Sequence, residues 1–159
     1  MLANPGFDQV VEIIIKNEGG YVNHPEDPGG ETKYGISKRQ YPNLEIRDLT
    51  IDQAKKIYLE DYWIPARCAE VPERLRAIYF DMVVLQGRYA AVRVLQHACN
   101  SMGYPVTIDG VLGPETSGYL TYIIPERLRA FRVASLANIA ANNNKWTFFY
   151  GWFQRAMNT

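Results

Sequence analysis

The residues best suited to acid–base chemistry lie near the start of the chain. Glu18 comes four residues after Ile14, so it ends an apolar helical stripe, and a double glycine follows it. Apolar surroundings and the negative end of a helix dipole both favour the neutral carboxyl group. Asp27 follows in a stretch rich in proline and glycine, where water and backbone amides favour the anion. A neutral acid near an anion is the pair of groups that glycoside hydrolysis uses.

Each of these residues also has a purely structural explanation. Glu18 fits a solvated glutamate before a glycine helix stop, and Asp27 fits a turn residue before Pro28-Gly29. Thr32 lies just past the glycines, where its hydroxyl could hold a water molecule or serve the turn. Periodicity alone leaves both interpretations open.

Three aromatic residues are candidates for sugar contacts, because the apolar face of a pyranose ring stacks on an aromatic ring. Tyr21 and Tyr34 flank the proline- and glycine-rich stretch, and Trp63 ends a helix expected to pack against it. For Trp63, a place in the core is an equally consistent interpretation.

Other chemically capable residues favour structural roles. Four aromatic residues at helical spacing near the C-terminus are expected to lie in the core; they are Trp146, Phe149, Tyr150 and Phe153. Asp81 lies among apolar residues and is expected to cap or bond buried backbone. His24 and His97 are far apart in sequence, so we predict no metal site, and hydrolysis needs no cofactor.

The elements that must position these residues are mainly helices. Apolar spacing predicts a helix from about Phe7 to Gly19, and Thr50 with Gln53 predicts a capped helix that runs to about Trp63. Further helices are predicted between residues 72 and 87, 87 and 103, from 114, over 125–140 and over 146–157. Residues 23–35 predict a structured loop or short hairpin. The predicted fold is mainly α, with an N-terminal lobe over residues 1–72 packed on a helical lobe over 73–159.

The composition of the chain disfavours several classes of protein, including nucleic-acid-binding, disulfide-rich and membrane-spanning proteins. The 159 residues carry 17 basic and 17 acidic side chains, so the net charge is zero and no broad positive field is available for nucleic acid. Two cysteines, Cys68 and Cys99, are too few for a disulfide framework, and we expect two buried free thiols rather than a bridge. The first residues lack a basic region, and the longest apolar run there, residues 13–15, is too short for a signal peptide or membrane span.

Two motifs resemble a known family. Glu18-Gly19-Gly20-Tyr21, followed by the segment from Asp27 to Ile36, resembles the glycoside hydrolase family 108 muramidases, which have a lysozyme-like fold. The resemblance continues through residues 61–63 and 80–81. The turn over residues 109–116 and the segment over 151–155 resemble the peptidoglycan-binding domain that follows the catalytic part in these proteins.

The resemblance implies a function and a mechanism. It makes Glu18 the catalytic acid that cleaves the β-1,4 bond between N-acetylmuramic acid and N-acetylglucosamine. Our own hypothesis adds that Asp27, with Thr32, positions the attacking water. The expected partner is the peptidoglycan glycan strand, with no nucleic acid, no membrane insertion and a monomeric chain. We expect an endolysin made in the host bacterial cytoplasm without a signal peptide, which reaches the cell wall through a permeabilised membrane. A bacterial muramidase with its own export machinery is an alternative that fits the same sequence.

Two other functions compete with this interpretation. A lytic transglycosylase would use one glutamate on the same bond without water, and it would leave an anhydro-muramic end. A non-catalytic wall-binding protein would rely on the turn over residues 109–116 and its neighbouring helices.

Overall fold

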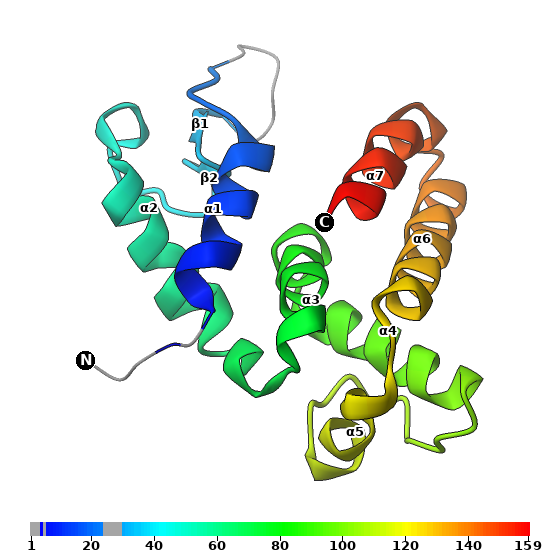
Figure 1. Cartoon of the computed structure of the whole chain (residues 1–159). Coiled ribbons are helices and arrows are strands. Elements are labelled where there is room, and N and C mark those ends of the chain that lie inside the picture. Colours follow the sequence, from blue (N-terminus) through cyan, green and yellow to red (C-terminus); the bar gives the residue numbers. More distant parts are fainter. Residues whose placement is uncertain (1–3, 5, 24–29) are drawn as a thin grey trace.

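A computed structural model describes residues 4, 6–23 and 30–159, and it is mainly helical, as predicted (Figure 1). Seven α-helices lie within these residues: α1 (Phe7–Glu18), α2 (Ile51–Ile57), α3 (Glu73–Gln86), α4 (Arg88–Ser101), α5 (Pro114–Tyr119), α6 (Pro125–Asn142) and α7 (Trp146–Asn158). Shorter elements are the strands β1 (Thr32–Lys33) and β2 (Ile36–Ser37), the 3₁₀ turns η1 (Ile46–Asp48), η3 (Cys68–Glu70) and η4 (Leu120–Tyr122), and the π-helical η2 (Tyr58–Trp63).

Helix α1 forms where the apolar spacing predicted it. Phe7, Val10, Val11 and Ile14 make its buried face. The helix ends at Gly19, whose φ of 78° lies in the left-handed region that a residue without a Cβ adopts at low cost. This stop leaves the side chain of the preceding residue at the C-terminal end of α1.

The predicted short hairpin is present in the described part of its segment. Strands β1 and β2 pair in antiparallel register, Thr32 opposite Ser37, around a two-residue turn. Both turn residues have positive φ, 52° at Tyr34 and 79° at Gly35, as a tight hairpin whose twist matches its strands requires. The hairpin therefore turns back sharply against α1.

The second predicted helix is capped as its sequence indicates. The Thr50 side chain accepts a hydrogen bond from the Gln53 amide, and the Gln53 side chain accepts one from the Thr50 amide. Beyond α2 the chain continues as η2, where a wider i→i+5 spacing brings Tyr58 and Trp63 into the core. A single helix was expected here, so this widening is a departure from the prediction.

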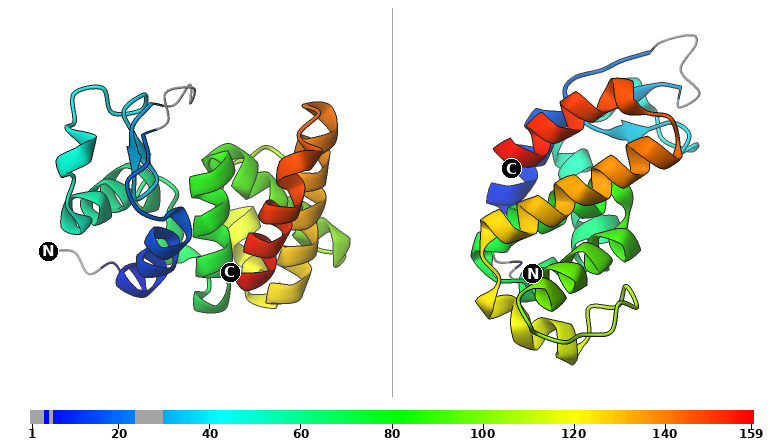
Figure 2. Two further views of the ribbon diagram at one scale, coloured as in Figure 1. Left: turned by 90° about the horizontal axis from the view of Figure 1, so that it is seen from above. Right: turned by 90° about the vertical axis from the view of Figure 1, so that its right-hand side faces the viewer.

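Helix α3 is the centre of the molecule. It contacts α1 and η2 on one side and α4 and α6 on the other (Figures 1 and 2). Seven of its residues are buried: Leu75, Ile78, Tyr79, Phe80, Asp81, Met82 and Val83. Phe80 packs edge-on against Trp63 and Phe7, which joins α3 to both N-terminal helices.

Helices α4 to α7 make the second half of the fold. Buried Gln96 on α4 donates hydrogen bonds to Asp109 and to Thr116, and it accepts one from the Gly110 amide. These bonds fix the turn over residues 109–116. Helix α6 then returns across α4, and α7 packs back on α6 (Figure 2).

The prediction that the C-terminal aromatic cluster lies in the core is wrong. Trp146 is 53% exposed, Tyr150 68% and Phe153 38%, while Ala156 is the buried residue of α7. The helix is apolar on more than one side, but it packs mainly on α6, so much of its aromatic surface stays uncovered. Helical spacing could not reveal how many neighbours the helix would have.

The cysteines are two buried free thiols, as predicted. Within the described residues, no helix is both long and apolar enough to cross a membrane. The same residues contain no cluster of three or more histidine, cysteine, aspartate or glutamate side chains arranged to hold a metal ion.

Candidate active site

Glu18 lies where the end of α1 meets the turn of the hairpin. A Cβ atom at Gly35 would lie 2.7 Å from Glu18 Cγ and 2.4 Å from the Tyr58 hydroxyl, closer than real atoms approach. Gly35 is therefore required twice, for its positive φ and for this close contact. The Tyr58 hydroxyl donates to the Tyr34 carbonyl at 2.9 Å and fixes the turn from the other side.

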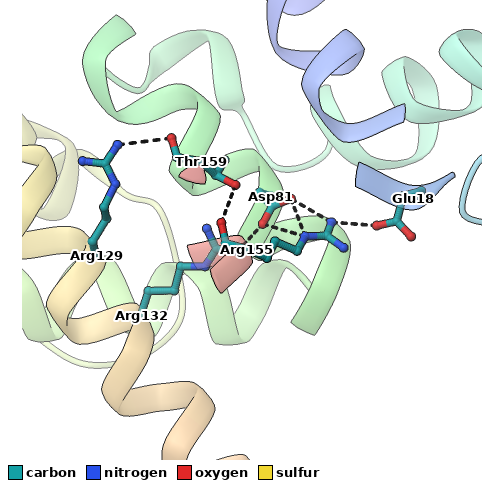
Figure 3. A network of polar contacts seen from close by, with 6 residues as sticks. All are labelled: Glu18, Asp81, Arg129, Arg132, Arg155 and Thr159. Carbon is teal, nitrogen blue, oxygen red and sulfur yellow. Dashed lines mark hydrogen bonds and ion pairs between the residues drawn. The ribbon is translucent and has the colours of Figure 1, made fainter. Parts of the chain in front are cut away.

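The polar partner of Glu18 comes from the far end of the chain. Arg155 on α7 donates from Nη2 to Glu18 Oε1 at 2.6 Å, and the two side chains are 17% and 21% exposed (Figure 3). The sequence predicted partial burial, which the structure shows, and a neutral carboxyl group, which stays a prediction. It did not predict the guanidinium partner.

Arg155 is itself held by Asp81 on α3. Its Nε and Nη2 donate to the two Asp81 carboxylate oxygens at distances from 2.7 to 3.1 Å. Asp81 is fully buried and also pairs with Arg132 of α6, which is equally buried (Figure 3). Asp81 was expected to bond buried backbone, and the structure corrects this: two guanidinium groups take up its carboxylate.

The charged groups around Asp81 and Glu18 shift the pKa values of their neighbours. Burial lowers the pKa of Arg132, and the neighbouring Asp81 charge opposes that shift. Burial also disfavours the charge of Arg155, but hydrogen bonds and charge from Asp81 and Glu18 outweigh it and raise the pKa of Arg155. Burial, and then the charge of Glu18, raise the pKa of Tyr58, so this phenol stays neutral beside the carboxylate.

The other predicted catalytic residues are only partly located. Asp27 lies outside the described residues. Thr32 begins the hairpin whose turn touches Glu18, and its backbone pairs with Val22 in both directions, Thr32 N to Val22 O at 2.9 Å and Val22 N to Thr32 O at 2.8 Å. Its side chain is partly exposed. Thr32 thus shares the hairpin that contacts Glu18.

Two of the predicted sugar-contacting aromatics are partly exposed beside the hairpin. The Tyr21 hydroxyl donates to Glu31 Oε1 at 2.9 Å, and the Arg47 guanidinium lies 5.8 Å from the centre of its ring. Tyr34 is in the hairpin turn itself, with the Lys33 ammonium 5.5 Å from its ring centre.

The third candidate, Trp63, is corrected to a core residue. Only 1% of it is exposed, and its ring packs edge-on against Phe7 and Phe80 at centroid distances of 5.3 and 5.1 Å. Both neighbours are buried, so no face of the indole is free to stack on a sugar.

Several residues of this site were not recognised from the sequence. Arg155 and Asp81 lie in motifs that the sequence singled out, but 74 residues separate them, and nothing local predicts their pairing. Gly35 lies in the motif from Asp27 to Ile36. A glycine at this place, between two short strands, is a signal from which a tight hairpin turn could have been predicted.

Two cavities lie away from Glu18, in the second half of the chain. One, of about 500 Å³, lies between α4 and α6 and is lined by Arg93, His97 and Asn138 among others. The other, of about 480 Å³, lies between α6 and α7 beside Phe153. Neither cavity includes the predicted catalytic residues.

Family models match nearly the whole chain. Residues 11–87 match the model of glycosyl hydrolase 108, and residues 90–157 match that of a predicted peptidoglycan domain. The chain thus carries a glycosyl hydrolase 108 domain followed by a peptidoglycan domain. The two matches meet at the junction of α3 and α4, so the Glu18 site lies in the hydrolase part while Arg155 comes from the peptidoglycan domain.

A solved structure supports this family 108 assignment. The structure titled "Structure of Brucella abortus SagA" is similar to this chain with a TM-score of 0.78 and 28% sequence identity, over 98% of this chain and 92% of that one. A comparison with curated proteins finds no match. The predicted mainly helical, lysozyme-like fold is confirmed. The chain is a glycoside hydrolase with a peptidoglycan domain.

Proposed function

We propose that this family 108 chain is an N-acetylmuramidase that hydrolyses the β-1,4 bond between N-acetylmuramic acid and N-acetylglucosamine in peptidoglycan. The observation that carries the proposal is the half-buried Glu18 carboxyl group at the end of α1, within a match to glycosyl hydrolase 108. The adjoining peptidoglycan domain supports the choice of substrate.

In the proposed reaction, Glu18 donates its proton to the glycosidic oxygen as an oxocarbenium-like state develops. Asp27 then orients the attacking water, with help from the Thr32 hydroxyl. Tyr21, beside the hairpin, and Tyr34, in its turn, contact the sugar rings. No metal or cofactor takes part in these steps.

The distance between the two carboxyl groups decides the stereochemical outcome. A separation of about 6.5 to 9.5 Å leaves room for water and gives inversion, whereas about 5 to 5.5 Å gives retention. Because Asp27 lies outside the described residues, the anomeric configuration of the first product is the measurement that distinguishes the two. Proton NMR of a chitooligosaccharide or muropeptide digest reports it directly.

Glu18→Gln tests the acid role. The amide keeps the shape of the side chain but has no proton to donate, so turnover of purified peptidoglycan should fall by about 10² to 10⁴-fold while sedimentation with cell walls is kept. Glu12→Gln is the matched control, because it makes the same chemical change at an exposed position of the same helix, α1. Unchanged turnover in Glu18→Gln would refute the assignment.

The products separate the two enzymatic alternatives. Hydrolysis leaves reducing muramic acid ends, and a lytic transglycosylase leaves anhydro-muramic ends that cannot be reduced by borohydride. Mass spectrometry of the digest, before and after borohydride treatment, distinguishes them.

The wall-binding alternative gains little from the turn over residues 109–116. The Asp109 carboxylate accepts hydrogen bonds from Gln96 at 2.7 Å and from the Val111 amide at 2.8 Å, which lower its pKa. These internal bonds are those of a structural turn.

We further assign the enzyme an endolysin role, as its family resemblance implies. The sequence divided the chain at residues 72 and 73, and the matches move that boundary to the junction of α3 and α4, so we assign catalysis to residues 11–87 and wall binding to residues 90–157. Expression in the bacterial cytoplasm should leave cells intact until the membrane is permeabilised, and lysis should then follow. Lysis without permeabilisation would contradict this role.

A further inference from the structure

Arg155 reaches from the peptidoglycan domain into the hydrolase part of the chain. It lies 137 residues after Glu18, yet its guanidinium contacts that carboxyl group directly at 2.6 Å (Figure 3). In Figure 1, α7 and α1 lie on opposite sides of α3, and Arg155 bridges them beside the α3 residue Asp81. The contact therefore joins three helices from both matched domains.

The guanidinium is held in one orientation. Its Nε and Nη2 make three hydrogen bonds to the Asp81 carboxylate, which leaves Nη2 also directed at Glu18 Oε1. Asp81 cannot swing toward solvent, because it is fully buried and also pairs with Arg132. A planar guanidinium fork fixed on one side presents its charge on the other with little loss of rotational freedom.

Charge balance pairs Arg155 with Glu18. Arg132 alone balances the single charge of Asp81, so Arg155 adds one positive charge, which Glu18 balances. The groups facing Glu18 in the described residues are Arg155, the neutral Tyr58 phenol and the backbone of the hairpin turn at Gly35. Arg155 is thus the one cation directed at this carboxyl group within the described residues.

This arrangement has a consequence for proton donation. When a general acid gives up its proton, negative charge develops on its carboxyl group, and a preorganised cation stabilises that charge without reorganisation. Arg155 engages Oε1, while Oε2 has no hydrogen-bond partner among the described residues and can face the leaving oxygen.

We propose that Arg155 of the peptidoglycan domain is a positioning residue of the active site, which orients Glu18 and stabilises its carboxylate as the proton leaves. This proposal rests on the acid role of Glu18 proposed above. It makes the two matched domains one catalytic unit, because α7 completes the site of the hydrolase part.

The test compares Arg155→Met and Arg155→Lys with Arg127→Met in the full chain. Arg127 is an exposed arginine on α6 and serves as the matched control. Initial rates on purified, solubilised peptidoglycan fragments are measured across pH 4 to 9 to give kcat and KM separately. Circular dichroism and thermal unfolding confine the comparison to folded protein at each pH.

For Arg155→Met we expect kcat to fall roughly tenfold to hundredfold with KM little changed. The alkaline limb of the pH profile should move to higher pH, because loss of the cation favours the protonated carboxyl group. Arg155→Lys should recover part of kcat and return the limb toward its original position, since the charge is kept but the fork is lost. Arg127→Met should match the unchanged protein in all three respects.

Three outcomes overturn the proposal. A folded Arg155→Met variant with unchanged kcat shows that the contact does not serve the chemistry. A loss of kcat with an unmoved alkaline limb, or one that lysine does not restore, assigns Arg155 a purely structural role. Full activity of Glu18→Gln, measured in parallel, refutes the proposed function instead, so failure of the two proposals is distinguishable.

Discussion

Removal of Asp81 is expected to destabilise the protein more than removal of any exposed carboxylate. The Asp81 and Arg132 side chains are both 0% exposed, and Arg155 is 17% exposed. In Asp81→Ala, Arg132 keeps its buried charge with no counter-ion, and its pKa is already lowered by burial. Breaking a buried ion pair from one side costs about 3 to 5 kcal/mol.

Two experiments at pH 7, both followed by circular dichroism, measure this cost. Urea unfolding gives the change in the free energy of unfolding, and thermal unfolding gives the change in Tm. For a protein of this size, 1 kcal/mol corresponds to about 2 to 4 °C in Tm, so Asp81→Ala should lower Tm by roughly 6 to 20 °C. Asp52→Ala is the control, because Asp52 is exposed in the first turn of α2 and its loss should cost less than about 1 kcal/mol.

A double variant separates the charge from the packing. Asp81→Leu with Arg132→Met replaces the buried pair by apolar side chains, and it should recover most of the lost free energy of unfolding, because no buried charge is left uncompensated. A change below about 1 kcal/mol in Asp81→Ala, or a double variant less stable than Asp81→Ala, would refute the reasoning.

Three further predictions concern other parts of the chain. Gly35→Ala should lower kcat/KM at least tenfold, which is about 1.4 kcal/mol in the activation barrier. The new methyl group would displace Glu18, whose Cγ lies 2.7 Å from that position. Gly118→Ala is the control, because Gly118 has open space around it, and its kcat/KM should not change. Hydrogen bonds lower the pKa of Asp109, so their contribution to stability is present above about pH 4 and is lost as pH falls through the lowered value. The urea midpoints at pH 7 and pH 3 should therefore differ less in Asp109→Asn than in the unchanged protein. Burial raises the pKa of Cys99 to about 11, so at pH 8 a thiol reagent should react with both free cysteines only after denaturation, and rapid reaction of the native protein would contradict their burial.

The sequence by itself determined the local elements. The apolar spacing of α1, the capping pair Thr50 and Gln53 and the paired glycines after Glu18 each act within a few residues, and all appear where they were predicted. The motif that begins at Glu18 also indicated the family, since it depends on consecutive residues rather than on packing. The helical fold followed from these local signals.

Only the tertiary structure decided the surroundings of Glu18. Its partner Arg155 lies 137 residues away, and the anchor of that arginine, Asp81, comes from a third helix. The same is true of the exposed α7 aromatics and buried Trp63, because helical spacing shows which residues share a face but not what covers it. Charge pairing between distant residues depends on long-range packing, and the spacing of residues along one helix carries no signal for it.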